Sequence, residues 1–222
     1  AAVGDLDRLQ VEARIARPGM ATASLELSNL VSDLQWRGEV AIERLDLAQW
    51  VDPAPLGPLH GSLAVHGDRY RYAATGLLHG AGVPASGVQV RGTASYADRL
   101  VTFPELRLAV EGGTVMLLQG TMSVAAEPAY DVAGQWTDFR WPLTGQAVLH
   151  SARGTLQARG WQQFAYELEG EFSPVGAPSF SGSASGRFTT TQMIVEQSAW
   201  KAYGGDIVAS GMLTRDELRA WT

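Results

Sequence analysis

Apolar and polar residues alternate along most of the chain, so that every second side chain over a short stretch is apolar. The clearest stretches are residues 9–15, 24–28, 34–43, 88–96 and 164–172. Alternation with a period of two places successive side chains on opposite faces of a β-strand. Strands buried on both faces of a parallel sheet are instead apolar throughout. The pattern therefore predicts antiparallel strands that each have one apolar and one polar face.

Two pairs of adjacent glycines, Gly112-Gly113 and Gly204-Gly205, each precede a short apolar run that ends in another glycine. A two-residue hairpin turn needs positive φ angles, which glycine adopts without steric cost. We therefore expect these four glycines to form hairpin turns. The expected partners across the turns are Val110 with Val115, Leu108 with Leu117, Ala202 with Ile207, and Trp200 with Ala209.

The pattern of glycines recurs later in the chain, and matching glycines are separated by a nearly constant number of residues. The segment GSLAVHG at 61–67 matches GTLQARG at 154–160, and Gly76 and Gly92 match Gly170 and Gly186. Several matches in register indicate an internal repeat. We divide the chain into a partial N-terminal repeat (1–56), a first full copy (57–147) and a truncated second copy (148–222), which together form one continuous unit. A proline-rich break at 53–58 precedes the first full copy.

Composition favours many short strands joined by tight turns. The 222 residues include 25 glycines, 45% hydrophobic residues and 18% charged residues. The only helix-like signal is a capping box at Thr214–Glu217. We expect an all-β fold of about 14 to 16 strands of ordinary length, arranged as a long, curled antiparallel sheet of repeated hairpins, taco-like, with an apolar groove. The alternative is a second sheet that covers the apolar faces in a sandwich.

Charge and chain features exclude several classes of protein. A net charge of −6 and a pI near 5.2 argue against nucleic-acid binding and against a polybasic membrane-surface patch. The chain has no cysteine, no apolar run of transmembrane length and no signal-peptide pattern at its N-terminus. Because the second copy stops in mid-repeat, we expect a segment of a larger protein rather than a whole cytosolic one.

Candidate catalytic and metal motifs are weak. The glycine-flanked GSASG at 182–186 has Ala184 where a nucleophile elbow carries serine. His60 and His66 share a strand face but lie about 20 Å apart along an extended strand, and His79 and His150 add no spacing motif. The row Glu167, Glu169 and Glu171 is typical of a solvated strand face. We therefore expect no enzyme, no metal and no cofactor. The tryptophan-rich segment 136–143 is interpreted as core or groove wall rather than as a ligand-stacking patch.

The combination of GSLAVHG, GTLQARG, the hairpins GGTVMLLQG and GGDIVASG, and the linkers LDLAQWVDPAPLG and FRWPLTG resembles the TamB/AsmA-like family of bacterial proteins, over nearly the whole chain. The resemblance implies a β-taco that crosses the periplasm of a Gram-negative bacterium from an inner-membrane anchor towards the outer membrane. It also implies phospholipid transport between the two membranes, support of outer-membrane biogenesis, and an outer-membrane barrel partner of the TamA type in a translocation and assembly module. Anchoring and docking would use regions outside this sequence.

A lipid groove makes physical sense for such strands, because two exposed acyl chains cost on the order of 20 kcal/mol in water at about 0.8 kcal/mol per CH₂. A groove built from copies of one unit offers equivalent apolar contacts at each step. Two other classes remain open: a structural or adhesive β-repeat scaffold, and a closed sandwich or barrel that binds one small ligand. The residues expected to line the groove are Val11, Ile15, Val88, Val90, Leu106, Leu108, Phe164, Tyr166 and Leu168.

Overall fold

The structure is a computed structural model. It describes residues 2–5, 7–16, 19–46, 57–125, 129–161, 163–189 and 191–214. Most of the predicted proline-rich break at 53–58 lies outside these residues, as do most of the linker LDLAQWVDPAPLG and of the capping box at 214–217. The chain divides into two compact units, Ala1–Glu111 and Gly112–Thr222, which are described separately.

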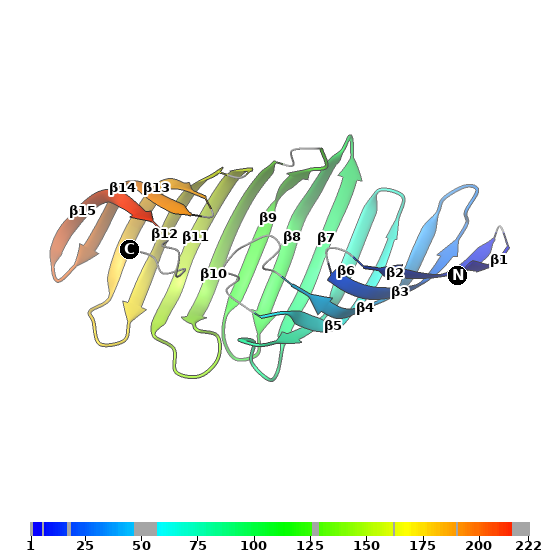
Figure 1. The fold of residues 1–222 in the computed structure, drawn as a ribbon, viewed down its shortest axis with the longest axis horizontal. Coiled ribbons are helices and arrows are strands. Elements are labelled where there is room, and N and C mark those ends of the chain that lie inside the picture. Colours follow the sequence, from blue (N-terminus) through cyan, green and yellow to red (C-terminus); the bar gives the residue numbers. More distant parts are fainter. Residues whose placement is uncertain are drawn as a thin grey trace. The chain divides into compact units, whose positions relative to one another are not determined.

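All regular secondary structure in the described residues is β-strand, which confirms the predicted fold class and strand number (Figure 1). None of these residues forms a helix of the length and apolar character that a membrane span needs. The strands of unit 1 are β1 (Ala2–Gly4), β2 (Arg8–Ile15), β3 (Gly19–Ser28), β4 (Gln35–Leu45), β5 (Leu59–Asp68), β6 (Arg71–Gly80), β7 (Val88–Ala97) and β8 (Leu100–Val110). Those of unit 2 are β9 (Val115–Ser123), β10 (Tyr130–Trp141), β11 (Leu149–Trp161), β12 (Gln163–Pro174), β13 (Phe180–Phe188), β14 (Gln192–Ala202) and β15 (Gly205–Thr214).

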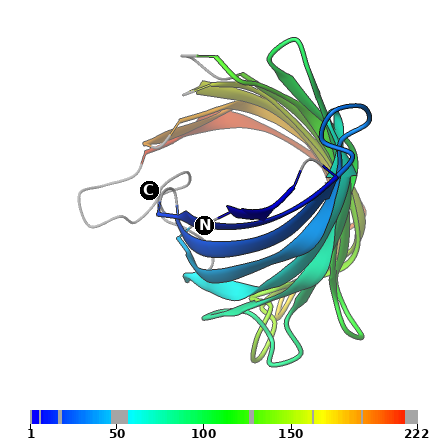
Figure 2. The same cartoon turned by 90° about the vertical axis from the view of Figure 1, so that its right-hand side faces the viewer.

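Within each unit the strands lie side by side in chain order, and every described pairing is antiparallel (Figure 1). Short connections between consecutive strands favour this meander because antiparallel neighbours need only a tight turn. The strands bend along their length, so neither sheet is flat (Figure 2). Register shifts contribute to this bending, since a β-bulge increases the local twist and curvature. One lies in β4, between Ile42 and Leu45, and another in β11, between His150 and Arg153.

The register keeps apolar residues together across many strands. One row in unit 1 runs from Ala13 on β2 through paired residues on each strand to Leu108 on β8: Ala13, Ala23, Val40, Leu63, Gly76, Val90 and Leu108. Because side chains alternate between faces, the polar residues on either side of each of these positions point to the opposite face. The predicted division into an apolar and a polar face is therefore present in the sheet.

The second glycine hairpin differs from the prediction by one residue. Tyr203 (φ 54°) and Gly204 (φ 77°) occupy the two left-handed positions, while Gly205 is the first residue of β15 and pairs with Ala202. Trp200 consequently pairs with Ile207 rather than with Ala209. The prediction was wrong because a tyrosine can also adopt the left-handed conformation. The pairing of β14 with β15 offsets the steric cost.

In the first glycine pair, Gly112 has a φ of 66°, as predicted. Gly113 was also expected to have a positive φ, and this prediction is wrong, because Gly113 is not among the described residues with positive φ. The partners predicted across this turn, Val110 with Val115 and Leu108 with Leu117, belong to different units.

Few side chains are buried. Among the described residues only five hydrophobic residues form a buried core: Ala23, Leu59, Val83, Trp136 and Tyr166. The accessible surface is 14208 Å², whereas two compact domains that share 23.8 kDa would together expose about 12,000 Å². Each unit is therefore an open, single-layered sheet. A sandwich would need a second sheet packed on the first within a unit, and the described strands of each unit form one sheet only.

Candidate functional site

The apolar face of unit 1, defined here by four rows of cross-strand neighbours on β2–β8, carries no charged side chain. Most of these residues are only half-buried, because within the unit no other described element packs on them. Each row mixes large apolar side chains with alanine and glycine, so the face presents mainly hydrocarbon. The rows are Leu9, Leu27, Trp36, Gly67, Tyr72 and Ala94; Val11, Leu25, Gly38, Val65, Ala74, Gly92 and Leu106; the row from Ala13 to Leu108 given above; and Ile15, Ala21, Ile42, Gly61, Leu78, Val88 and Val110.

The two polar groups on this face are satisfied by the protein itself. Trp36 Nε1 donates a hydrogen bond to the carbonyl oxygen of Asp68 (3.0 Å), and Tyr72 Oη donates to that of Arg69 (3.3 Å). The two rings lie near each other, with centroids 5.8 Å apart, on either side of Gly67. A Cβ on Gly67 would lie only 2.7 Å from Cζ2 of Trp36. Glycine therefore lets the indole lie flat against the sheet.

The apolar face of unit 2 has the same construction on β9–β15. Its rows are Met116, Trp136, Gly154, Gly170, Gly182, Trp200 and Ile207; Leu118, Gly134, Leu156, Leu168, Ala184, Ser198 and Ala209; Gly120, Val132, Ala158, Tyr166, Gly186, Val195 and Gly211; and Met122, Tyr130, Gly160, Phe164, Phe188, Met193 and Leu213. Ser198, the one non-aromatic polar residue in these rows, is buried and donates to the carbonyl oxygen of Ala209 (2.8 Å).

Aromatic rings are concentrated on the unit 2 apolar face. Phe172 contacts Trp136, Phe180 and Trp200, with ring centroids 6.3, 5.4 and 5.9 Å away. Phe164 stacks on Phe188 at 5.0 Å. The predicted role of segment 136–143 as wall or core agrees with the position of Trp136, which is buried on this face.

All nine residues predicted to line a groove lie on these two apolar faces. Val90 and Leu108 are direct neighbours, and so are Val88 and Val110. Ile15 is the most exposed of the nine, with 44% of its surface accessible, whereas Tyr166 is buried and its Oη donates to the carbonyl oxygen of Ile194 (3.4 Å). Six of the nine residues lie on the apolar face of unit 1, and the other three lie on the apolar face of unit 2.

Two hollows are lined mostly by the opposite, polar faces. The unit 1 hollow encloses about 2050 Å³, and of the nine predicted residues only Val11 borders it. The unit 2 hollow, of about 980 Å³, is bordered by none of them. Sequence reasoning missed these hollows, because the curvature that produces them is not encoded in the alternation of single strands.

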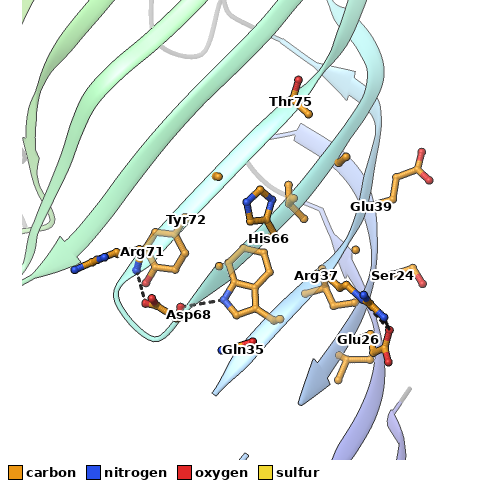
Figure 3. Close-up of a pocket in the computed structure, with 18 of the residues that line it drawn as sticks. Ser24, Glu26, Gln35, Arg37, Glu39, His66, Asp68, Arg71, Tyr72 and Thr75 are labelled. Atoms are coloured by element: carbon orange, nitrogen blue, oxygen red, sulfur yellow. Dashed lines mark hydrogen bonds and ion pairs between the residues drawn. The ribbon is translucent and has the colours of Figure 1, made fainter. Parts of the chain in front are cut away.

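The unit 1 hollow contains a cross-strand charge cluster (Figure 3). The Glu26 carboxylate accepts hydrogen bonds from Arg37, at 2.9 and 3.1 Å, and forms an ion pair with Arg8 at 2.8 Å. The hydrogen bond from Arg37 lowers the pKa of Glu26, with a smaller contribution from the charge of Arg8. These arginines are largely exposed, so the pairs orient side chains more than they stabilise the fold.

The four histidines occupy different environments. His60 and His66 are exposed, as predicted. His150 Nε2 lies 2.8 Å from the Asp138 carboxylate, which also accepts hydrogen bonds from Arg140. His79 is half-buried and lies directly opposite His60. In the described part of the chain, no group of three or more metal-ligating side chains is present.

Comparison of the chain with protein-family models, with curated proteins and with solved structures found no match. The functional interpretation therefore depends on the two apolar faces and on the sequence patterns.

Proposed function

We propose that the apolar faces of the two units shield phospholipid acyl chains from water, as part of a periplasmic protein that moves lipids between the inner and outer membranes. The observation that carries this proposal is the pair of extended, half-buried apolar faces, which no second layer of described residues covers within either unit. Exposed apolar surface of this extent marks a site for an apolar partner.

The chemistry of the faces favours hydrocarbon over a peptide or a sugar as the occupant. A peptide or sugar brings hydrogen-bonding groups that must be satisfied when they leave water. On these faces the polar atoms of Trp36, Tyr72 and Ser198 are already bonded within the sheet. An acyl chain needs no such partner and gains about 0.8 kcal/mol for each CH₂ removed from water.

Repetition along the sheet supports movement rather than tight capture. Each row stays almost entirely apolar from one strand to the next, so a sliding chain exchanges one hydrocarbon contact for another. The resemblance to the TamB/AsmA-like family supports the periplasmic location and the outer-membrane barrel partner. The location and the barrel partner are part of the proposal. We also propose that the protein is not an enzyme.

Site-specific photo-crosslinking tests the proposal. A photoreactive residue at Val90 faces Leu108 on the apolar side, whereas one at the adjacent Gln89 projects from the polar face. Leu168 and Glu169 provide the same matched pair in unit 2. After incubation with phospholipid vesicles, we expect lipid adducts at positions 90 and 168 and few at 89 and 169.

Two outcomes would overturn the lipid proposal. Equal capture at both members of each pair would show nonspecific contact with the sheet. Absence of adducts at all four positions, in protein with an unchanged circular dichroism spectrum, would favour the scaffold alternative. Native mass spectrometry of the purified protein provides an independent readout, because bound phospholipid adds a defined mass.

A further inference from the structure

His60 on β5 and His79 on β6 face each other across the hairpin that joins these strands. They are direct partners in the antiparallel register, and their ring centroids lie 5.9 Å apart with the planes inclined by 31°. The pairing extends from Leu59 with Gly80 to Gly67 with Tyr72, so the two backbones are held firmly in place. The imidazoles therefore meet because of the fold and not because of a sequence motif.

The spacing of the rings suits a shared metal ion. Metal–nitrogen bonds of about 2.0–2.1 Å allow two imidazoles on one ion to have centroids at most about 6.4 Å apart. The observed 5.9 Å lies within that limit. Small side-chain rotations, which the exposed His60 can make, would bring the two nitrogens to the angle of a tetrahedral or square-planar site.

Residues on both sides of the histidine pair border the proposed site. His79 is followed across the sheet by Gly87, where a Cβ would lie only 2.9 Å from His79 Cε1. On the other side, the β4 bulge places both Glu43 and Arg44 opposite His60 in the register. The Glu43 carboxylate accepts a hydrogen bond from Thr22 (3.2 Å) and lies 3.9 Å from Arg14, and Arg44 pairs with Asp46 at 3.4 Å. Two imidazoles form a half-site whose remaining coordination positions water can complete.

We propose that His60 and His79 form a bidentate site for a divalent transition-metal ion, with Cu²⁺ as the preferred occupant. Imidazole is a favoured ligand of copper, zinc and nickel, and Cu²⁺ has the highest affinity of the divalent first-row series for a given set of ligands. The ion would bridge β5 and β6 on the polar face, away from the apolar face proposed to contact lipid. The two proposals therefore succeed or fail independently.

Titration of the untagged protein with CuCl₂ at neutral pH tests this site. We expect one Cu²⁺ per chain, an electron paramagnetic resonance spectrum with nitrogen ligation, and a Tm rise of about 5 °C when the metal is well above its Kd. His60→Gln and His79→Gln should each weaken binding on the order of 10²-fold, because the second imidazole binds an ion that the first already holds nearby. His66→Gln is the matched control on the same strand and face, and it should bind as the parent protein does.

Equal Cu²⁺ affinity in the parent protein and in both His60→Gln and His79→Gln would overturn the proposal, and so would an equal loss in His66→Gln. Binding should also weaken as the pH falls, since histidine ligates metals only when neutral. Affinity that stays constant between pH 7.5 and pH 5 would contradict imidazole ligation. Circular dichroism of each variant without metal verifies that it is folded.

Discussion

The indole nitrogen of Trp136 donates a 2.8 Å hydrogen bond to the hydroxyl oxygen of Ser151, a residue with no exposed surface. Ser151 lies where the register of β11 shifts, between His150 and Arg153. The shift lets a serine from the neighbouring strand reach the indole. Trp136 can therefore lie buried on the apolar face without an unpaired donor, which would otherwise cost stability.

Ser151→Ala removes the acceptor but keeps the indole donor buried. We expect the free energy of unfolding to fall by about 1–3 kcal/mol, the usual cost of an unsatisfied buried polar group. Ser183→Ala, at an exposed position on β13, should change it by no more than about 0.5 kcal/mol. Urea denaturation of both variants measures the difference. A Ser151→Ala variant as stable as the parent would show that the indole finds another acceptor.

The two glycines of the second hairpin should respond differently to valine. Gly204→Val places a β-branched side chain at a φ of 77°, and we expect a loss of about 1–3 kcal/mol from this strain. Gly205→Val should be tolerated, because its Cβ would meet no atom closer than Ala202 O at 3.8 Å. Thermal melts of both variants test the turn assignment. Greater sensitivity at Gly205 than at Gly204 would restore the turn position predicted from sequence.

Val90→Arg tests whether the unit 1 apolar face is open. In an uncovered face the arginine stem can lie along apolar neighbours while its guanidinium reaches water. We therefore expect a folded protein that binds less phospholipid. Gln89→Arg, which places the same side chain on the polar face, should bind lipid normally. Lipid retention after gel filtration, together with circular dichroism, separates these outcomes, and unfolding of Val90→Arg would indicate a sealed core instead.

Asp138 should make part of the stability of unit 2 depend on acid pH. Its pKa is lowered, chiefly by the hydrogen bond with His150 and further by Arg140. A carboxyl group with a depressed folded-state pKa contributes stability above its unfolded pKa of about 3.9, and that contribution disappears as the pH falls through the folded value. The side chain is 38% exposed, so screening keeps the effect below about 1 kcal/mol.

Asp138→Asn isolates this charge, because asparagine also tolerates the left-handed φ of 50° found here. Between pH 7 and pH 2.5, the variant should lose less stability than the parent protein does. Asp98→Asn is the matched control, since Asp98 has the same φ of 50° but lies in a hairpin turn. Superimposable stability curves for the parent protein and Asp138→Asn would contradict the assignment.

The strands and their two faces follow from local chemistry and were predictable. A period of two is a property of a single extended segment, so the alternation around Val11, Val90 and Leu168 placed each of them on an apolar face before any pairing was known. Glycine likewise identified the second hairpin to within one residue. The turn of Asp98 and Arg99, with φ angles of 50° and 62°, was not predicted, because it lacks the glycine that marks the strongest two-residue turn signals.

Register and coverage depend on contacts between segments, and only the three-dimensional arrangement established them. His60 meets His79 because the hairpin pairs residues symmetrically about its turn. The sequence pattern within one strand had suggested only His66 as a neighbour on the same face. The hydrogen bond between Trp136 and Ser151 depends on a register shift that no local pattern records. The alternating pattern of a strand is the same whether a second sheet covers its apolar face or water reaches that face. The open faces became visible only when strand order showed one layer in each unit.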